Sequence, residues 1–253
     1  MTTASDARPL DGRVALITGA ARRSGRATAM ALAADGAAVV LNVRQSRDEA
    51  EANKREIEAA GGKAMVAVAD ITDEAQVRGM IDAIVGRFGG LHILVNNAAD
   101  RRQARFEEMT YADWKHITSI VLDGAFFCTR YAVPHMLKAG WGRIVNLGGI
   151  GHHAGFLHRA HVHTAKAGLE GLTRGLAIEY ADKGITVNCV APGRIGGPRS
   201  KTAGSSAPNA KTPPTGFEGA PEDIAAAIRY VCSPDARFVT GQTIHVNGGQ
   251  FLT

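Results

Sequence analysis

Residues 13–25 read RVALITGAARRSG, and this stretch decides the fold. It opens with an apolar, β-branched run, 13–18, that is long enough for one buried strand. Gly19 and Gly25 bracket the turn that follows, and an alanine-rich segment typical of a helix comes next. Glycines at such a turn let another group approach the backbone, and the helix start offers unpaired N–H groups to an anion. The stretch therefore predicts the first strand–turn–helix unit of an α/β sheet, with an anion-binding end.

Six further apolar runs follow along the chain, separated by helical patterns of about 10 to 25 residues. They lie at 38–43, 63–68, 91–96, 143–147, 185–190 and 242–246. Strands that are apolar throughout are buried on both faces, and parallel neighbours need a crossover connection such as a helix. We therefore predict one α/β domain over 1–253: a doubly wound (Rossmann) sandwich of seven parallel strands with helices on both faces.

One segment interrupts this alternation of strands and helices. Residues 194–220 are rich in Gly, Pro, Ser, Thr and Lys, and they precede a helix that opens with PEDI at 221–224. A connection of this length inside a compact domain is usually functional. We expect 194–220 to form a substrate loop.

The composition excludes several classes of protein. The 253 residues are 45% hydrophobic and 21% charged, as in an ordinary globular domain. No apolar run approaches the roughly 20 residues that span a bilayer, and residues 1–12 carry no export signal. We therefore expect a cytoplasmic protein that does not associate with a membrane. The three cysteines lie far apart without a CxxC pair. Lys and Arg are scattered despite the net charge of +5, which argues against nucleic acid and for an anionic small molecule.

The end of the second predicted strand distinguishes between two dinucleotides. After a glycine turn of this kind, an acidic residue there binds the ribose 2′-OH of NAD, whereas a basic one accepts the 2′-phosphate of NADP. Val43 stands at that position, Arg44 and Ser46 follow it, and Arg22 and Arg23 lie on the facing turn. Guanidinium groups bind phosphate through paired hydrogen bonds. We predict NADP(H); the alternative is a solvated basic surface.

These segments resemble the short-chain dehydrogenase/reductase family over nearly the whole chain, and the 3-oxoacyl carrier protein reductases in particular. Beyond the glycine turn the matches are Asp70, NNAA at 96–99, AKAG at 165–168, APG at 191–193 and TGQTIHVNGG at 240–249. The turn departs from the family's TGxxxGxG because Arg23 replaces the middle glycine, and in this it resembles the pteridine reductases. Such a replacement suits NADP, since the guanidinium can face the 2′-phosphate.

The resemblance implies a set of cofactor-binding residues and a homotetramer. The tetramer would use the long fourth and fifth helices and the C-terminal strand, where apolar stretches such as AFFC at 125–128 recur. The implied cofactor residues come from the glycine turn, the strand ends and the lysine-bearing helix: Thr18, Gly19, Ala21, Arg22, Arg23, Ser24, Gly25, Arg44, Ser46, Asp70, Ile71, Asn97, Ala98, Ala99, Lys166, Pro192 and Gly193.

The catalytic tetrad of that family is largely absent. Lys166 matches its lysine, but Val162 stands at the tyrosine position, Gly149 at the serine position and Val121 at the asparagine position. Carbonyl reduction by hydride needs a proton donor at the forming alkoxide, and valine and glycine donate no proton. Lys166 keeps a role in binding the nicotinamide ribose.

Five histidines gather where the resembled family has its substrate pocket. They are His152, His153, His158, His161 and His163. One interpretation is a polar, partly exposed loop; another is an imidazole that replaces the tyrosine as acid and base, because imidazole titrates near neutral pH. A metal site is a third, but neither HExxH nor a companion carboxylate lies nearby in the sequence, so we expect no metal.

Three functions are compatible with this pattern. The first is an atypical NADP(H)-dependent oxidoreductase of a small carbonyl or alcohol substrate, with a pocket histidine or water as the proton donor. The basic run RRQAR at 101–105 would favour an anionic substrate, although it also fits a solvated loop. The second is an NADP(H)-binding protein without redox turnover, either a sensor or the partner subunit of an active relative. The third is a lyase or isomerase that reuses the pocket.

Overall fold

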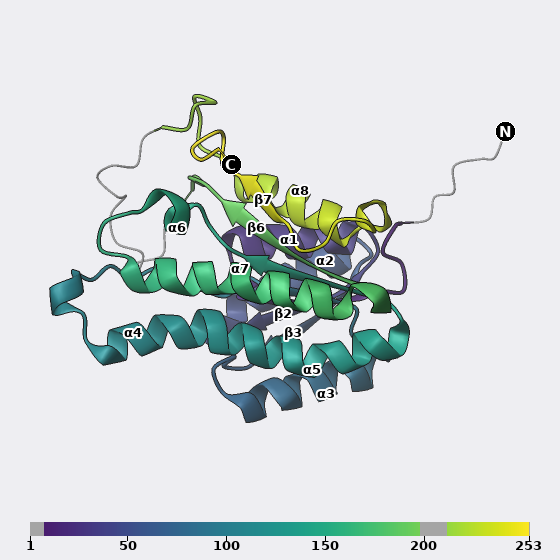
Figure 1. The fold of residues 1–253 in the computed structure, drawn as a ribbon. Coiled ribbons are helices and arrows are strands. Elements are labelled where there is room, and N and C mark those ends of the chain that lie inside the picture. Colours follow the sequence, from purple (N-terminus) through teal and green to yellow (C-terminus); the bar gives the residue numbers. More distant parts are fainter. Residues whose placement is uncertain (1–7, 198–211, 253) are drawn as a thin grey trace.

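The computed structural model describes residues 8–197 and 212–252, which form one parallel sheet covered by helices on both faces (Figure 1). The strand order is β3-β2-β1-β4-β5-β6-β7, and every neighbouring pair is parallel. The strands are β1 Val14–Thr18, β2 Ala38–Val43, β3 Lys63–Val68, β4 Ile93–Asn96, β5 Gly142–Leu147, β6 Ile185–Pro192 and β7 Thr243–Val246. The predicted fold class is confirmed.

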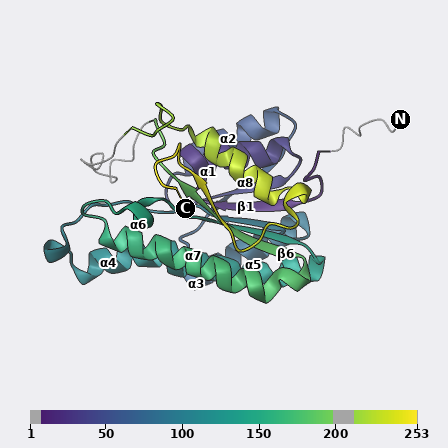
Figure 2. The ribbon, with the colours of Figure 1, turned by 45° about the horizontal axis from the view of Figure 1, so that its top comes forward.

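The helices divide into two layers, visible edge-on in Figure 2. One layer holds α1 Arg23–Ala34, α2 Arg47–Ala59 and α8 Pro221–Cys232; the other holds α3 Glu74–Phe88, α5 Gly124–Ala139 and α7 Ala160–Tyr180. Helix α4, Tyr111–Thr118, runs into α5 through a π-helical turn, Ser119–Asp123, and the short α6 is Gly151–Ala154. Three single 3-10 turns lie at Phe106–Glu108, Ala181–Lys183 and Pro234–Ala236.

Alternate side chains of each strand point to opposite layers, which is why the strands are apolar throughout. In β1, Ala15 and Ile17 pack toward α1 and α8, whereas Val14 and Leu16 pack toward α3 and α5. The order of the strands reverses between β1 and β4. Open α/β sheets bind ligands at the carboxyl ends of the strands beside such a reversal, which places the expected site at one edge of this sheet.

The connection between β6 and α8 is described only at its two ends. Gly196 N donates to Gly219 O over 2.8 Å, and Gly219 N donates to Arg194 O over 3.1 Å, so the ends are tied together. Helix α8 begins at Pro221, as predicted. Residues 198–211 of the predicted substrate loop lie outside the described residues.

No helix within 8–197 or 212–252 combines the length and the apolar character that crossing a bilayer requires.

Candidate functional site

The glycine turn after β1 has the geometry of an anion cradle. Gly19 adopts φ +65°, and a Cβ on Gly25 would lie 2.4 Å from the carbonyl oxygen of Gly19, so both positions need glycine. Helix α1 begins directly after Arg22, without a capping side chain or a first-turn acid among its described residues. Its first N–H groups are thus available to a negative group. These residues fit the pyrophosphate of a dinucleotide.

The end of β4 holds this turn in place. Thr18 Oγ1 accepts hydrogen bonds of 3.0 Å from the backbone N–H groups of Asn97 and Ala98. The Asn97 side chain donates to the carbonyl oxygens of Thr18, over 2.8 Å, and Gly19, over 3.0 Å. Thr18, Asn97 and Ala98 are therefore brought together, and their side-chain and backbone polar groups position the turn. Ala99 follows them in the chain.

The end of β2 brings Arg44 close to Asp70. Their guanidinium and carboxylate groups lie 3.6 Å apart, and both side chains are partly exposed. Partial burial raises the pKa of Asp70, but hydrogen bonds from Thr72 and the charge of Arg44 outweigh it and leave the pKa lowered. Ile71 is buried against α5, because a Cβ on Gly124 would lie 2.5 Å from its Cδ1. Only the backbone of Ile71 can face a ligand.

The remaining residues of the turn differ in what they contact. Arg22 donates to Ser46 Oγ over 3.1 Å and forms an exposed ion pair with Glu49. The carbonyl oxygen of Ala21 accepts a hydrogen bond from the Asn53 side chain over 2.9 Å, and Ser24 lies in the first turn of α1. Arg22 and Ser46 therefore share the surface at the end of β2.

Arg23 of the turn contacts a distant segment of the chain. It begins α1 with φ +50°, and its guanidinium donates to the carbonyl oxygen of Ile195 over 3.0 Å. The side chain thus reaches the base of the 194–220 loop, and the expectation that it faces the 2′-phosphate stays a prediction. This partner lies 172 residues further along the chain, so no local pattern reveals it.

Lys166 lies at the carboxyl end of β5, close to the end of β6. Its ammonium group is buried and donates to the carbonyl oxygen of Leu147. Burial lowers the pKa of Lys166 to about 8. Gly193 passes so close to β7 that a Cβ would lie 2.5 Å from Asn247 Cα, and Pro192 accepts from the N–H of Ile150 over 3.1 Å. Lys166, Pro192 and Gly193 therefore border the same edge as the glycine turn.

Two of the three positions at which the resemblance predicts a polar tetrad residue lie in the same apolar group. Val121 lies in the π-helical turn and Val162 in the first turn of α7, and both belong to one buried apolar group, the valine cluster. Its buried members are Ile117, Val121, Ala125, Val162, Ala165 and Leu169. A Cβ on Gly149, the third position, would find only the carbonyl oxygen of Pro192 within 4 Å, at 3.9 Å. The tyrosine and asparagine positions are thus apolar, and the serine position borders open space.

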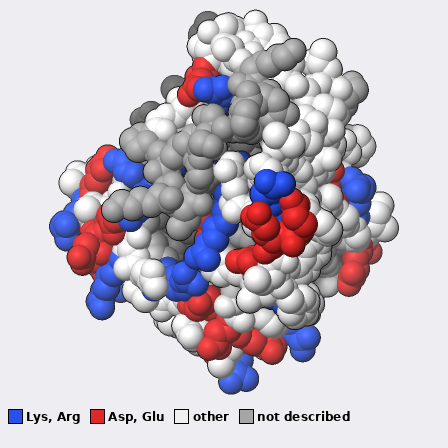
Figure 3. Space-filling model, turned by 90° about the vertical axis from the view of Figure 1, so that its left-hand side faces the viewer, with Lys and Arg blue, Asp and Glu red and all other residues white. Residues whose placement is uncertain are grey.

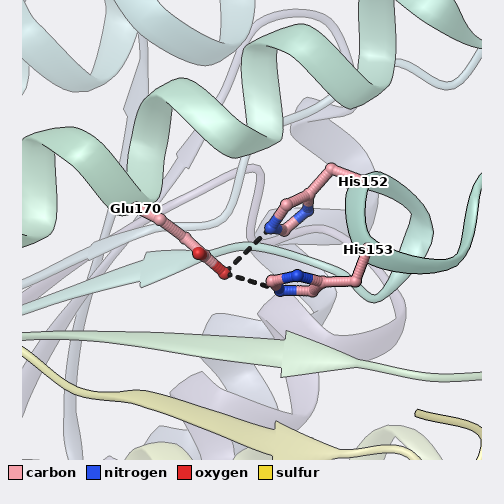
Figure 4. A group of neighbouring side chains, drawn as sticks. All are labelled: His152, His153 and Glu170. Atoms are coloured by element: carbon pink, nitrogen blue, oxygen red, sulfur yellow. Dashed lines mark hydrogen bonds and ion pairs between the residues drawn. The ribbon is translucent and has the colours of Figure 1, made fainter. Parts of the chain in front are cut away.

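The five histidines separate into different environments. His152 and His153 of α6 both face Glu170 of α7, with Nε2 atoms 2.9 and 3.2 Å from Glu170 Oε1 (Figure 4). Glu170 is thus a companion carboxylate, contrary to the expectation from the sequence that none lies near the histidines. Glu170 lies one helical turn after Lys166 and comes to α6 only through the packing of α7. Burial lowers the pKa of His152, and the charge of Glu170 partly opposes this.

The other three histidines point elsewhere. His161 is fully buried, and neither ring nitrogen has a hydrogen-bond partner among the described residues. Burial lowers its pKa, while the nearby carboxylates of Asp113 and Asp100 oppose the shift. His163 lies under α6, where a Cβ on Gly151 would approach its Nε2 to 2.8 Å. His158 is exposed with φ +62°. Successive helix positions diverge by about 100°, which explains the separation of His161 from His163.

The basic run at 101–105 is largely paired with acidic groups. Arg102 lies 3.0 Å from Asp100, and Arg105 lies 2.7 Å from Glu107. Figure 3 shows this side of the molecule, where Lys and Arg are interspersed with Asp and Glu. The run therefore offers less positive charge to a substrate than its composition indicates.

Comparisons with known proteins agree with this geometry. Residues 19–250 match the family described as Enoyl-(Acyl carrier protein) reductase. The chain is 40% identical over 251 residues to (2S)-[(R)-hydroxy(phenyl)methyl]succinyl-CoA dehydrogenase subunit BbsD of Thauera aromatica, covering 96% of this chain and 98% of that protein. It is 38% identical to the 3-oxoacyl-[acyl-carrier-protein] reductase of a Synechocystis species, again covering 96% and 98%.

A solved structure shows the same architecture. A dehydrogenase/reductase from Sinorhizobium meliloti 1021 superimposes with a TM-score of 0.88 at 34% identity, covering 96% of each chain. Sequence and fold agree over nearly the full length. The chain belongs to the short-chain dehydrogenase/reductase family of oxidoreductases.

Proposed function

We propose that this chain is an NADP(H)-dependent oxidoreductase that interconverts a small ketone and its secondary alcohol without a catalytic tyrosine. One observation carries the proposal. The glycine turn, the Asn97 side chain that bonds to it and buried Lys166 all lie at the carboxyl ends of the strands, which we call the cofactor edge. The names of three relatives support the substrate class, since they specify a 3-oxoacyl reductase, a hydroxyl-bearing succinyl-CoA dehydrogenase and a 3beta-hydroxysteroid dehydrogenase.

The preference for NADP(H) rests on the end of β2. A carboxylate at Val43 would repel a 2′-phosphate, and none stands there. Arg44 is half exposed and lies beside Asp70, so its guanidinium can exchange this 3.6 Å contact for a phosphate. Arg22 and Ser46 add donors to the same surface. An anionic substrate remains part of the proposal, with Arg101 as the exposed basic residue nearest the end of β4.

Lys166 supplies the proton in this proposal, through a water in the space beside Gly149. Bound NADPH would supply the hydride. As the carbonyl carbon is reduced, its oxygen gains an electron pair and takes a proton from the water, which regains one from the Lys166 ammonium. A donor with a pKa of about 8 is protonated at neutral pH and matched to this task. In this proposal Val162 and Val121 exclude bulk water from one side of the site, which strengthens the electrostatic effect of the ammonium group.

The experiment that tests the proposal is a calorimetric titration of the protein with NADPH and with NADH. A panel of ketones, including acyl thioesters, then follows while absorbance of the reduced nicotinamide is monitored. Tight NADPH binding with oxidation of the cofactor by a ketone is expected. The proposal fails if neither dinucleotide binds, or if NADH binds more tightly.

A second function is favoured by the valine cluster. Apolar packing of Val121 and Val162 removes two hydrogen-bonding positions at once, which suits a chain that binds NADP(H) without turnover. The Thauera relative is named as a subunit, and this chain could likewise support an active partner chain. Tight NADPH binding combined with no oxidation across the ketone panel would favour this function over the first.

We also propose a homotetramer. Large apolar side chains are exposed on elements that lie on the outside of the described chain, among them Phe126 of α5 at 46%, Ile178 of α7 at 85% and Phe238 at 98%. Exposed apolar side chains of this size are candidates for contacts between subunits. Light scattering coupled to size-exclusion chromatography measures the assembly directly, and a monomer would contradict the proposal.

A further inference from the structure

A group of three metal-ligand side chains lies beside the carboxyl ends of β5 and β6. His152, His153 and Glu170 place their ligand atoms within 4.8 Å of one another (Figure 4). We call these three residues the His–His–Glu group. They come from two elements, α6 and α7, and the proposed oxidoreductase function uses none of them.

The spacing of the group suits a single cation. Zinc lies about 2.0–2.2 Å from imidazole nitrogen and carboxylate oxygen, so two tetrahedral ligands lie about 3.4 Å apart. Glu170 Oε1 lies 2.9 Å from Nε2 of His152 and 3.2 Å from Nε2 of His153. A shift of a few tenths of an ångström would bring both pairs to metal spacing. We propose that His152, His153 and Glu170 bind one divalent transition-metal ion of the zinc or cobalt class.

The surroundings hold the two imidazoles in place. The His153 ring stacks on Phe251 with centroids 4.5 Å apart and an interplanar angle of 11°. The His152 and His153 rings are themselves 3.9 Å apart, so one ion can contact both. A divalent ion binds imidazole through a neutral ring nitrogen, and its charge would be balanced in part by the Glu170 carboxylate. Arg174 approaches the other oxygen, Glu170 Oε2, at 3.7 Å and leaves Oε1 to the two rings.

A third imidazole lies next to the group. The His245 ring centroid is 5.1 Å from that of His153, and its Nδ1 is buried without a hydrogen-bond partner among the described residues. A buried, unpaired imidazole nitrogen is costly unless a donor or a metal occupies it. His245 is in register with Ala191, the residue before Pro192. The ion would therefore lie next to the ends of β5 and β6, with the His245 ring packed against the ring of His153.

The test uses the tag-free full chain after treatment with a chelator. Cobalt(II) is titrated while its visible absorption is recorded, and zinc is titrated by calorimetry, in both cases without dinucleotide or substrate. One ion per chain with the absorption of a nitrogen- and oxygen-ligated cobalt is expected. Loss of an outer-shell partner alone costs about 10- to 100-fold in metal affinity, so Glu170→Gln and His153→Gln should each weaken binding by at least about tenfold.

His135→Gln is the matched control, because His135 lies on α5, outside the group. It should bind cobalt and zinc as the unmodified chain does. Melting temperatures measured without zinc check that each variant folds. Zinc should raise the melting temperature of the unmodified chain and of His135→Gln, but not that of Glu170→Gln or His153→Gln. The proposal is overturned if the unmodified chain binds no ion, or if Glu170→Gln and His153→Gln bind it unchanged. Neither result depends on NADP(H) or on turnover.

Discussion

Val121 of the π-helical turn and Val162 of α7 lie in the same buried apolar cluster, with 2% and 6% of their surfaces exposed. The family resemblance leads us to expect an asparagine and a tyrosine at these positions. Both valines instead belong to one apolar group with Ile117, Ala165 and Leu169, so hydrophobic burial stabilises the chain at both positions. One packed apolar group therefore occupies both of the expected polar positions.

Replacing Val162 by the family's tyrosine tests this packing. Val162→Tyr inserts a large ring and a hydroxyl into the valine cluster, and overpacking of this kind costs about 1–3 kcal/mol. We expect the free energy of unfolding in urea to fall by that amount. Val162→Ile, which adds one methylene, is the control and should cost clearly less. Unchanged stability of the tyrosine variant would mean that position 162 borders open space.

Exchanging Arg44 for aspartate should reverse the dinucleotide preference. Arg44→Asp removes the proposed phosphate ligand and adds a carboxylate suited to a ribose 2′-OH. We expect the Kd for NADPH to rise at least tenfold, about 1.4 kcal/mol, while the Kd for NADH falls. Calorimetric titration measures both constants. Lys63→Asp makes the same change in charge at the exposed start of β3. This position lies at the end of the sheet opposite to Arg44, so the preference should be unaltered.

Buried Lys166 predicts a specific dependence of stability on pH. The pKa of Lys166 is lowered from 10.5 to about 8 by burial, so the folded chain binds fewer protons than the unfolded chain between these values. Charged Lys166 lowers the free energy of unfolding, and this destabilisation is fully present below about pH 8. It is relieved as the pH rises from about 8 toward 10.5, so the free energy of unfolding increases over that range. Lys166→Met removes the penalty. We expect this variant to gain stability relative to the unmodified chain at pH 7.

The comparison of two pH values separates this effect from packing. Urea unfolding of both chains at pH 7 and at pH 9.5 should show the advantage of Lys166→Met shrinking at the higher pH. A difference that stays constant between the two pH values would show that Lys166 titrates normally in the folded chain.

His161 provides a test of a buried imidazole. Both of its ring nitrogens are buried without a hydrogen-bond partner in the described part of the chain, and such a group costs about 1–3 kcal/mol. His161→Leu replaces the imidazole with an apolar side chain of similar volume, so we expect the free energy of unfolding to rise. His158→Asn is the control, because His158 is exposed and asparagine tolerates its φ of +62°; it should change stability by less than about 0.5 kcal/mol. A large loss of stability in His161→Leu would indicate that its imidazole has a partner in solution.

The amino-acid sequence by itself determined the architecture, and from it we predict that the tetrad is altered. Hydrophobic runs of four to eight residues located all seven strands, with ends that differ from the observed ones by no more than two residues, because burial on both faces of a sheet is a local property. The glycine turn was equally readable, since the backbone at Gly19 and Gly25 has no room for a Cβ. Fixed spacing from Lys166 sufficed to place Val162 and Gly149 at the tetrad positions.

Only the tertiary structure decided which side chains meet. Glu170 reaches His152 and His153 because α6 packs on α7, and Arg23 reaches Ile195 because the glycine turn lies beside the end of β6. Five histidines that are neighbours in the sequence separate because helical rotation directs His161 and His163 to different sides of α7. Contacts of this kind depend on how helices and loops pack on the sheet, and local periodicity carries no record of that packing.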